Sequence, residues 1–250
     1  MFRLSENTGS LFVLPTHSTY SIMLRAVCLQ HVPFEGPGAF ATALTARGVR
    51  LERYLVPQDG LPKDVGDLLI VMGGPMSVND SDGWIAEETE FIRSAILAGK
   101  PVIGVCLGSQ FMAKALGTKV RSGKELEIGM TPVHLTKEGK SDPVFSACPE
   151  TFDVFEWHGE IFDLPNHCVP LAGSDIAPLQ AFRYGPRADG LLFHLEMEQA
   201  GIDALCHECA PDLTKARLAG DTVRSTALPH LPQLHQTADR LVAHLLNSAR

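Results

Sequence analysis

The chain has 250 residues, of which 45% are hydrophobic and 20% are charged, and its formal net charge at pH 7 is −8. A chain of this size and composition forms one or two globular domains whose core needs no disulfide or metal. The negative charge argues against a nucleic-acid polymer or an anionic membrane as the main partner. Six irregularly spaced cysteines favour a reducing compartment, so we expect a cytoplasmic protein without a disulfide framework.

The first 22 residues differ in character from the rest of the chain. They contain a short apolar patch that Pro15 interrupts, and they lack a convincing small-residue cleavage site, so a signal peptide is not expected. We expect residues 1–22 to form a poorly ordered extension. Met23 is a candidate start of translation, because the first strand-like segment comes directly after it.

From Met23 the chain alternates between apolar strand-like segments and segments with helical periodicity. The strands are expected at 24–30, 51–55, 67–72 and 101–105, and the helices at 38–47, 87–98 and 108–116. Gly48 and Gly99 stand where C-terminal caps of two of these helices would be. Such alternation predicts βαβ units and a parallel sheet.

The middle of the chain has shorter strands joined by turns, which suggests some antiparallel pairing. These strands are expected at 130–135, 152–155 and 179–183, followed by a buried apolar strand at 190–194. After Glu196 the chain is mostly helical and ends in a long segment over 231–246. No interdomain linker is evident, so one domain with a helical C-terminal tail is the simplest organisation.

Cys106 is the strongest candidate for a catalytic residue. It comes after the apolar strand at 101–105 and precedes Leu107, Gly108 and a helix, which is the strand–turn–helix context of a nucleophile elbow. Small residues such as Gly104 and Gly108 let the sharp turn form, and the helix N-terminus favours the reactive thiolate. The backbone N–H of Leu107 would point at a developing oxyanion. A buried structural cysteine is the competing interpretation of this segment alone.

Two further segments would complete such a site. Gly73 and Gly74 come after the strand at 67–72 and form a candidate second wall of an oxyanion hole. His194 ends the strand at 190–194, and Glu196 would project to the same side if the extended conformation persists. A carboxylate there can orient the imidazole of a catalytic base. His158, which precedes Gly159 and Glu160 in an expected turn, is the second choice for that base.

A single CxxC pair, Cys206 and Cys209, lies in a helix-like region without a second pair at metal-binding spacing. Two helical cysteines are the default interpretation of such a pair. We therefore expect neither a metal nor a cofactor.

Six segments, in order, resemble the class I (triad) glutamine amidotransferase family, and most closely stand-alone proteins related to the glutaminase domain of GMP synthase. They begin at Gly73, Gly104, Glu127, Trp157, Gln180 and Phe193, and the resemblance runs from about Met23 to Glu196. The resemblance implies an α/β fold with three layers, in which a mixed, mainly parallel, flavodoxin-like sheet has helices on both faces. It also implies a catalytic domain over 23–197. From the helical pattern that follows, we expect a tail over 198–250 that packs on the same domain.

The resemblance assigns a role to each matched residue. Residues Cys106, His194 and Glu196 match the catalytic triad, and Gly74 and Leu107 match the oxyanion-hole positions. Gln110 matches the motif glutamine that helps hold the substrate, and Gly73 and His158 are expected to shape the same site. Three positions depart from the commonest pattern, namely Ser109, Leu192 and Leu195; because none of these removes a reacting group, substrate preference is more in question than catalysis.

Three functions are compatible with these residues. The first is a glutamine amidotransferase or glutaminase that attacks the glutamine amide through Cys106 and releases ammonia for an acceptor or a synthetase subunit. The second is a γ-glutamyl hydrolase or transferase with a larger amine as the leaving group, and the third is a silent binding or regulatory protein. The chain has no recognisable GxxxxGK[ST] loop, so an ATP-driven amination by this chain alone is not expected.

Overall fold

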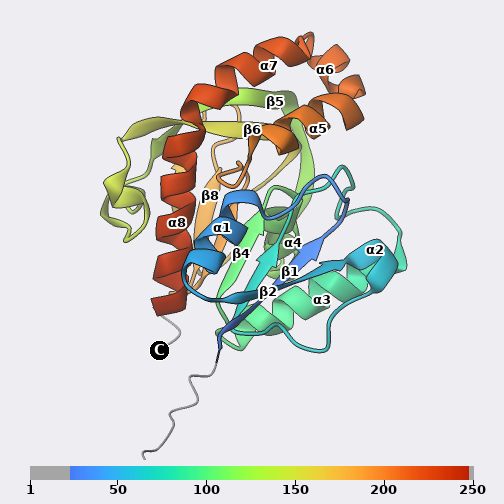
Figure 1. Ribbon diagram of the computed structural model, residues 1–250, viewed down its shortest axis with the longest axis vertical. Helices are drawn as coiled ribbons and strands as arrows, with labels where there is room; N and C mark the ends of the chain where they lie inside the picture. The colour runs from blue at the N-terminus through green and yellow to red at the C-terminus, as the bar shows by residue number, and fades with distance from the viewer. Residues whose placement is uncertain (1–22, 248–250) are drawn as a thin grey trace, which may run out of the picture.

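The computed structural model describes residues 23–247, so the extension expected at residues 1–22 lies outside the described part (Figure 1). The strands are β1 (Arg25–Gln30), β2 (Arg50–Leu55), β3 (Leu68–Val71), β4 (Val102–Val105), β5 (Val120–Leu135), β6 (Thr151–Phe162), β7 (Cys168–Gly173), β8 (Ala181–Tyr184) and β9 (Ala188–Leu191). The α-helices are α1 (Gly38–Ala46), α2 (Val56–Asp59), α3 (Gly83–Leu97), α4 (Leu107–Ala115), α5 (Gln199–Glu208), α6 (Ala210–Ala216), α7 (Gly220–Ala227) and α8 (Leu231–Asn247). The fold also contains the 3-10 turns η1 (Gly139–Ser141), η2 (Phe145–Ala147) and η3 (Leu228–His230).

The strands form one mixed, nine-stranded sheet in the order β2-β1-β3-β4-β9-β8-β7-β5-β6. The strands from β2 to β9 pair in parallel, and the pairs from β9 to β6 are antiparallel. Strands β3, β4 and β9 are buried at every residue, as expected for parallel strands covered on both faces. The parallel and antiparallel parts are therefore of similar size.

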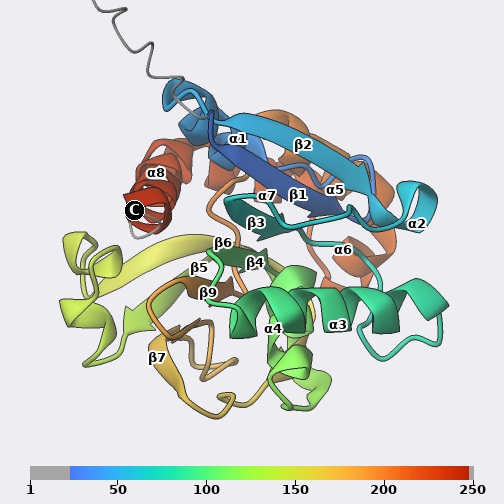
Figure 2. The same cartoon turned by 90° about the horizontal axis from the view of Figure 1, so that it is seen from below.

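Helices cover both faces of the parallel part, which gives three layers. Helices α3 and α4 lie together on one face, and α1 and α8 lie together on the other (Figure 2). Each face has its own hydrophobic core, because side chains that alternate along the strands point to opposite sides. The predicted α/β fold with helices on both faces of a mixed sheet is confirmed.

The antiparallel part differs most from expectation. Strand β5 begins ten residues before the expected start at 130. The sequence did not predict this first part as a strand, because residues 121–126 are mostly polar or charged. A register shift also interrupts its pairing with β6 between Ser122 and Glu127. Strand β6 extends to Phe162, so the expectation of a turn around His158 was wrong. Strand β7 was not predicted, because its segment contains Pro170 and Gly173 and shows little alternation.

The long β5–β6 hairpin and helices α5 to α7 lie above the carboxyl ends of the central strands (Figure 1). An isolated antiparallel bridge joins Phe155 of β6 to His194, which has already left β9. Helices α6 and α7 contact β5, and α8 runs back along α1. Residues that lie far apart in sequence therefore meet at the carboxyl edge of the sheet, where ligands bind in open α/β folds.

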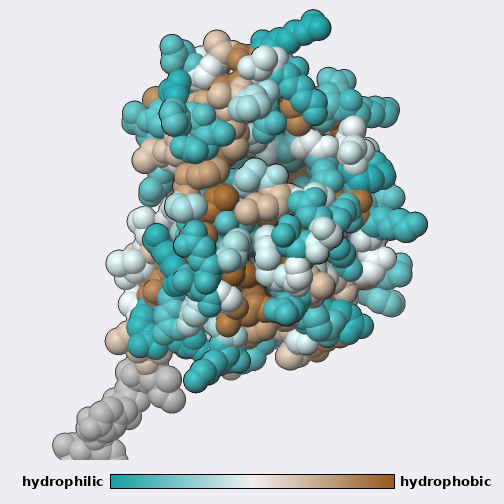
Figure 3. All heavy atoms as spheres, turned by 90° about the vertical axis from the view of Figure 1, so that its right-hand side faces the viewer, coloured by the Kyte–Doolittle hydropathy of each residue, from teal (hydrophilic) through white to brown (hydrophobic). Residues whose placement is uncertain are grey.

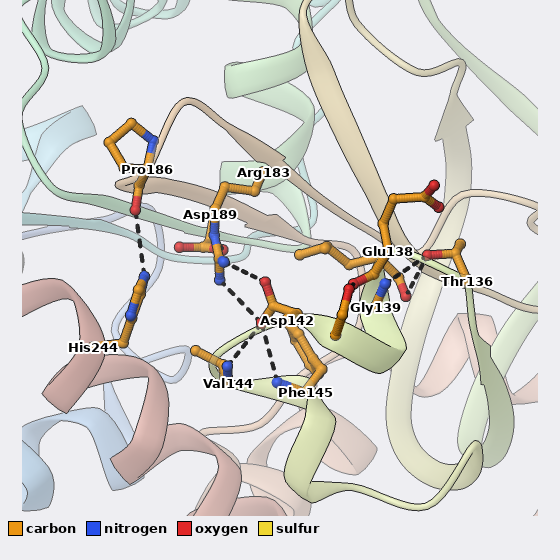
Figure 4. A network of polar contacts seen from close by, with 12 residues as sticks. Thr136, Glu138, Gly139, Asp142, Val144, Phe145, Arg183, Pro186, Asp189 and His244 are labelled. Atoms are coloured by element: carbon orange, nitrogen blue, oxygen red, sulfur yellow. Dashed lines mark hydrogen bonds and ion pairs between the residues drawn. The ribbon is translucent and has the colours of Figure 1, made fainter.

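A buried polar network surrounds Arg183 in the antiparallel part, away from this edge (Figure 4). The Arg183 guanidinium donates to Asp189 Oδ1 at 2.6 Å and also to the carboxylate of Asp142. Asp142 Oδ1 in turn accepts from the N–H groups of Val144 and Phe145, at 2.8 and 3.1 Å. The network therefore fastens the loop around η1 and η2 to strands β8 and β9.

The face of the molecule seen in Figure 3 is mostly hydrophilic, with small hydrophobic areas between charged side chains. Within residues 23–247, no helix has the length and apolar character that a membrane span requires.

Candidate active site

Cys106 lies in a sharp turn between β4 and α4. Its backbone has φ 50° and ψ −110°, and it is one of three non-glycine residues with positive φ among residues 23–247. Such a conformation costs about 1–3 kcal/mol and is common at functional sites. Helix α4 packs so closely on β3 that a β-carbon at Gly108 would overlap the Val71 carbonyl. The strand–turn–helix arrangement expected around Cys106 is thus present.

The thiol of Cys106 is buried and lies near β6. The residue is 6% exposed, and its Sγ atom is 3.6 Å from the carbonyl oxygen of Trp157, to which it donates. Leu107 is the first residue of α4, so the helix does not use its backbone N–H. That group is available to a ligand beside the thiol.

His194 and Glu196 form a buried pair. Nδ1 of His194 lies 2.7 Å from Glu196 Oε1, and the two side chains are 1% and 2% exposed. The backbone N–H of His194 donates to the Phe155 carbonyl at 2.8 Å, and the Phe155 ring packs edge-on against the imidazole. These contacts hold the imidazole in one orientation.

The remaining ring nitrogen, Nε2 of His194, is buried and has no hydrogen-bond partner among residues 23–247. Burial by itself lowers the pKa of His194, but the charge of Glu196 and the neighbouring Cys106 thiol outweigh this effect and raise the pKa well above its usual value. The site therefore stabilises the imidazolium that forms when Nε2 of His194 takes up a proton. A group with a displaced pKa beside a nucleophile is typical of a catalytic acid or base.

Gly73 and Gly74 come directly after β3 at the carboxyl edge. A β-carbon on Gly73 would overlap Glu35 Oε2 and lie 3.4 Å from His194 Cε1, so only glycine fits between these side chains. Gly74 lines the same pocket as Cys106, whereas Gly73 is not among the residues that line it. The structure thus brings Gly74 to the thiol and places Gly73 behind it.

Gln110 and His158 both line this pocket. Gln110 Nε2 donates to the Glu160 carbonyl at 3.5 Å, and its Oε1 is buried without a partner in the described part of the chain. His158 Nε2 lies 3.1 Å from Glu156 and 3.3 Å from Glu127. Although burial lowers the pKa of His158, these carboxylates raise it to about 10, so its imidazole is a buried cation.

His158, Glu127 and Glu156 are also the one group among residues 23–247 whose ligand atoms are arranged as a metal ion would need, with all three within 4.8 Å of one another. Burial raises the pKa of Glu156, which favours its neutral form. In the same part of the chain Cys206 and Cys209 form no such group, and both are buried thiols.

The pocket around Cys106 holds about 330 Å³, which lies within the range of small-molecule sites. Loops after β1 and β3 form one side, and the β5–β6 hairpin forms another. Helices α5 and α6 form a third side, through Leu205, Cys209, Asp212 and Lys215. Trp157 Nε1 donates to Asp212 at 3.2 Å, which ties α6 to β6.

The sequence did not predict that residues of α5 and α6 line this pocket, nor that Glu35 does. Glu35 is 7% exposed, and burial raises its pKa to about 7. An acidic residue in a loop directly after a parallel strand could have drawn attention, because ligands gather at such loops. No local signal in 205–215 marks those residues as part of a site.

Known proteins resemble this chain over most of its length. A family model described as "Glutamine amidotransferase class-I" matches residues 39–200. The glutamine amidotransferase-like protein YfeJ of Salmonella typhimurium is 30% identical over 202 residues, which cover 78% of this chain and 84% of YfeJ. A GMP synthase (glutamine-hydrolyzing) of Tolumonas auensis is 31% identical over 209 residues, or 74% of this chain, but the match spans only 39% of that synthase.

The solved structures that are similar in fold include further glutamine amidotransferases. A glutamine amidotransferase of Thermotoga maritima has a TM-score of 0.82 and 25% identity, covering 89% of this chain and 98% of its own. A glutamine amidotransferase of Methylobacillus flagellatus has a TM-score of 0.81 and 25% identity, with 90% and 95% coverage. The expected resemblance is confirmed, and the chain belongs to the class I glutamine amidotransferase family, a family of amide-hydrolysing enzymes.

Proposed function

We propose that this protein hydrolyses the side-chain amide of glutamine through a γ-glutamyl thioester on Cys106, and releases ammonia for a separate acceptor. The observation that carries the proposal is one pocket holding a cysteine on a strained elbow, close to a buried His194–Glu196 pair whose Nε2 has no partner within residues 23–247. A nucleophile, a base and a group that orients the base are the parts that thiol amidases need.

In the first half of the reaction, His194 Nε2 takes the thiol proton and Cys106 Sγ attacks the amide carbon. The oxyanion that forms is bound by the backbone N–H groups of Leu107 and Gly74. His194, held as an imidazolium by Glu196, then gives its proton to the departing nitrogen, and ammonia leaves. The raised pKa of His194 fits the state that precedes the attack, in which thiolate and imidazolium exist together.

In the second half, His194 takes a proton from water, and the resulting hydroxide attacks the thioester carbonyl. The same two N–H groups bind the second oxyanion. Collapse returns the proton to the Cys106 sulfur and releases glutamate. One glutamine and one water thus give one glutamate and one ammonia.

The outer part of the pocket suits an amino acid head group. Asp212 and Lys215 lie three residues apart on α6, so they lie on the same side of that helix, and both line the pocket. We infer that Asp212 attracts the α-ammonium group and Lys215 the α-carboxylate, with Gln110 nearer the amide.

We infer that the reaction that consumes the ammonia takes place outside the part of the chain that forms this pocket. The match to this chain spans only 39% of the GMP synthase of Tolumonas auensis, so most of that synthase has no counterpart in the matched region. We therefore place the acceptor reaction, and any synthetase subunit, outside residues 23–247. The six free thiols support the cytoplasm as the compartment.

A panel of substrates tests the proposal. Purified protein is given glutamine and several γ-glutamyl amines, and ammonia, glutamate and free amine are measured. Ammonia release from glutamine supports the proposal, whereas a marked preference for a γ-glutamyl amine points to a γ-glutamyl hydrolase. Labelling of Cys106 by an electrophilic glutamine analogue is measured in parallel, because a subunit that needs its partner for turnover can still react with the label. Absence of both turnover and labelling would contradict the proposal.

Cys106→Ala is expected to abolish both labelling and turnover, with a loss of at least about 1,000-fold, because the thioester can no longer form. Circular dichroism and urea unfolding should match the wild type, since the change removes one buried sulfur atom. Cys209→Ala is the matched control, because Cys209 lines the same pocket outside the proposed triad. Appreciable turnover by the Cys106 variant would contradict the mechanism.

A further inference from the structure

His31 is a buried residue directly after β1 that has no part in the reaction described above. It is 2% exposed, and its two ring nitrogens both have polar partners. Nδ1 lies 2.9 Å from the carbonyl oxygen of Gly73, and Nε2 lies 3.0 Å from Glu88 Oε1 in α3. Because a carbonyl oxygen can only accept, Nδ1 of His31 must carry a proton and donate it.

The Gly73 carbonyl belongs to the same peptide group as the N–H of Gly74. Within residues 23–247 all peptide bonds are trans, and in a trans peptide the C=O and the N–H point in opposite directions. His31 holds the carbonyl end, on the side of α3. The N–H of Gly74 is thereby directed away from His31, and Gly74 lines the pocket that contains Cys106.

The ring that makes this contact has little freedom to move. It packs against Trp84 at 5.7 Å and Phe111 at 5.5 Å, and these two rings lie 6.2 Å from each other, measured between ring centroids. Trp84 and Glu88 come from α3, and Phe111 comes from α4, the helix that begins directly after Cys106. The anchor of the Gly73 carbonyl is therefore packed against the same helix that positions the nucleophile.

A Gly-Gly segment needs such an anchor. Neither residue has a β-carbon, so each peptide group can rotate through conformations that other residues cannot adopt. Without His31 the Gly73–Gly74 peptide could turn its N–H out of the pocket.

We propose that His31, backed by Glu88, is a positioning residue that fixes the Gly73–Gly74 peptide so that the Gly74 N–H serves as an oxyanion donor. The proposal rests on the proposed function, in that it assigns what holds one donor of that reaction in place. It adds two residues outside the triad on which the rate of acyl transfer depends.

The test compares His31→Leu with the wild type in two reactions at Cys106. Hydrolysis of the preferred γ-glutamyl amide forms an oxyanion, whereas alkylation by iodoacetamide displaces iodide from a saturated carbon and forms none. In His31→Leu we expect kcat to fall about 10- to 100-fold, because a misdirected donor loses part of the effect of one oxyanion-hole contact. KM and the alkylation rate should each stay within about threefold, a limit that corresponds to less than about 1 kcal/mol.

Two variants sharpen this comparison. His31→Asn keeps an N–H donor near the position of Nδ1 and should recover most of the lost kcat. His134→Leu is the matched control, because His134 is an exposed residue on β5 whose hydrogen bond, to Thr151, is remote from the pocket. Its kcat, KM and alkylation rate should equal those of the wild type.

Three results would overturn the proposal. One is an unchanged kcat in His31→Leu, and another is a fall in alkylation by the same factor as hydrolysis, which indicates general damage to the pocket. The third is a crystal structure of His31→Leu, or of His31→Gln if the former does not fold, in which the lost Nδ1 contact leaves the Gly74 N–H unmoved; the Gln amide reaches only the position of Nε2, toward Glu88. That structure decides the matter even if the wild type hydrolyses nothing, so failure of the proposed function and failure of this inference are told apart.

Discussion

At the scale of single residues, the pocket depends on groups whose charge is set by their neighbours. Glu196 favours the protonated form of His194, and Glu127 and Glu156 favour that of His158. For Glu35 the effect of burial on the pKa outweighs the nearby charges of His194 and His31. The pocket and the residues beside it therefore contain two histidines whose protonated forms are favoured and a carboxyl group that titrates near neutral pH.

The two members of the buried His194–Glu196 pair should not contribute equally to catalysis. His194→Ala removes the atom that transfers the proton, so we expect kcat to fall by roughly 10⁴-fold or more. Glu196→Ala removes only the orientation and charge support at Nδ1, and its loss should be at least about tenfold smaller. Steady-state rates on the preferred substrate measure both losses. Equal losses, or a larger one for Glu196→Ala, would contradict the assigned roles.

Glu35 should make the free energy of unfolding depend on pH. Burial raises its pKa from 4.5 to about 7, so the folded state binds this proton more tightly than the unfolded chain does. The resulting stabilisation is complete below about pH 4.5 and is lost as the pH rises through 7, by roughly 3 kcal/mol at most.

Glu35→Gln stays neutral at every pH and escapes this loss. Urea unfolding of both proteins from pH 5 to 8 should show the variant gaining stability relative to the wild type as the pH rises. Other titrating groups, such as Asp189, cancel in that difference. A difference that does not change with pH would contradict the assignment.

At the scale of secondary-structure elements, one motif of the family resemblance has a structural role. The segment that begins at Gln180 contains Arg183, which does not line the catalytic pocket but joins β8 and β9 to the loop around η1 and η2. Burial raises the pKa of Asp189 to about 7 even though Arg183 lowers it, so the network depends on this guanidinium.

Arg183→Met should destabilise the protein by about 3–5 kcal/mol, because Asp142 and Asp189 remain buried without their cation. Urea unfolding measures the change, and kcat of the folded fraction should be unaffected. Arg224→Met is the matched control, since its pairs with Asp203 and Asp221 are partly exposed and screened by solvent, so their loss should destabilise the protein far less. Similar losses for both variants would show that the network adds nothing by being buried.

At the scale of the whole molecule, the C-terminal helices take part in both the core and the pocket. Helix α8 buries Leu234, Leu241 and Leu245 in the same hydrophobic core as α1 and the sheet. Helices α5 and α6 reach the other end of the molecule and line the pocket. Residues after 197 therefore hold the fold together and also limit what reaches Cys106.

Leu241→Ala should lower the free energy of unfolding by about 2–5 kcal/mol, because Leu241 is fully buried and its loss leaves a cavity. Leu218→Ala is the control, because that side chain is 37% exposed and its removal should change the stability by about 0.5 kcal/mol or less. Denaturant midpoints of the two variants measure the difference. A small effect for Leu241 would mean that α8 is a dispensable attachment.

The sequence by itself determined the parallel half of the sheet, because strands β1, β3 and β4 are apolar runs that alternate with helical segments of matching length. It also located Cys106, His194 and Glu196, since the elbow and the i, i+2 pair are local patterns. The tertiary structure alone decided what surrounds them. Long-range pairing makes His158 part of a strand, and packing brings Glu35 and α6 into the pocket and His31 onto the Gly73 carbonyl. His31 and Gly73 lie 42 positions apart in the sequence, and the periodicity of a single segment cannot predict a contact between residues so far apart.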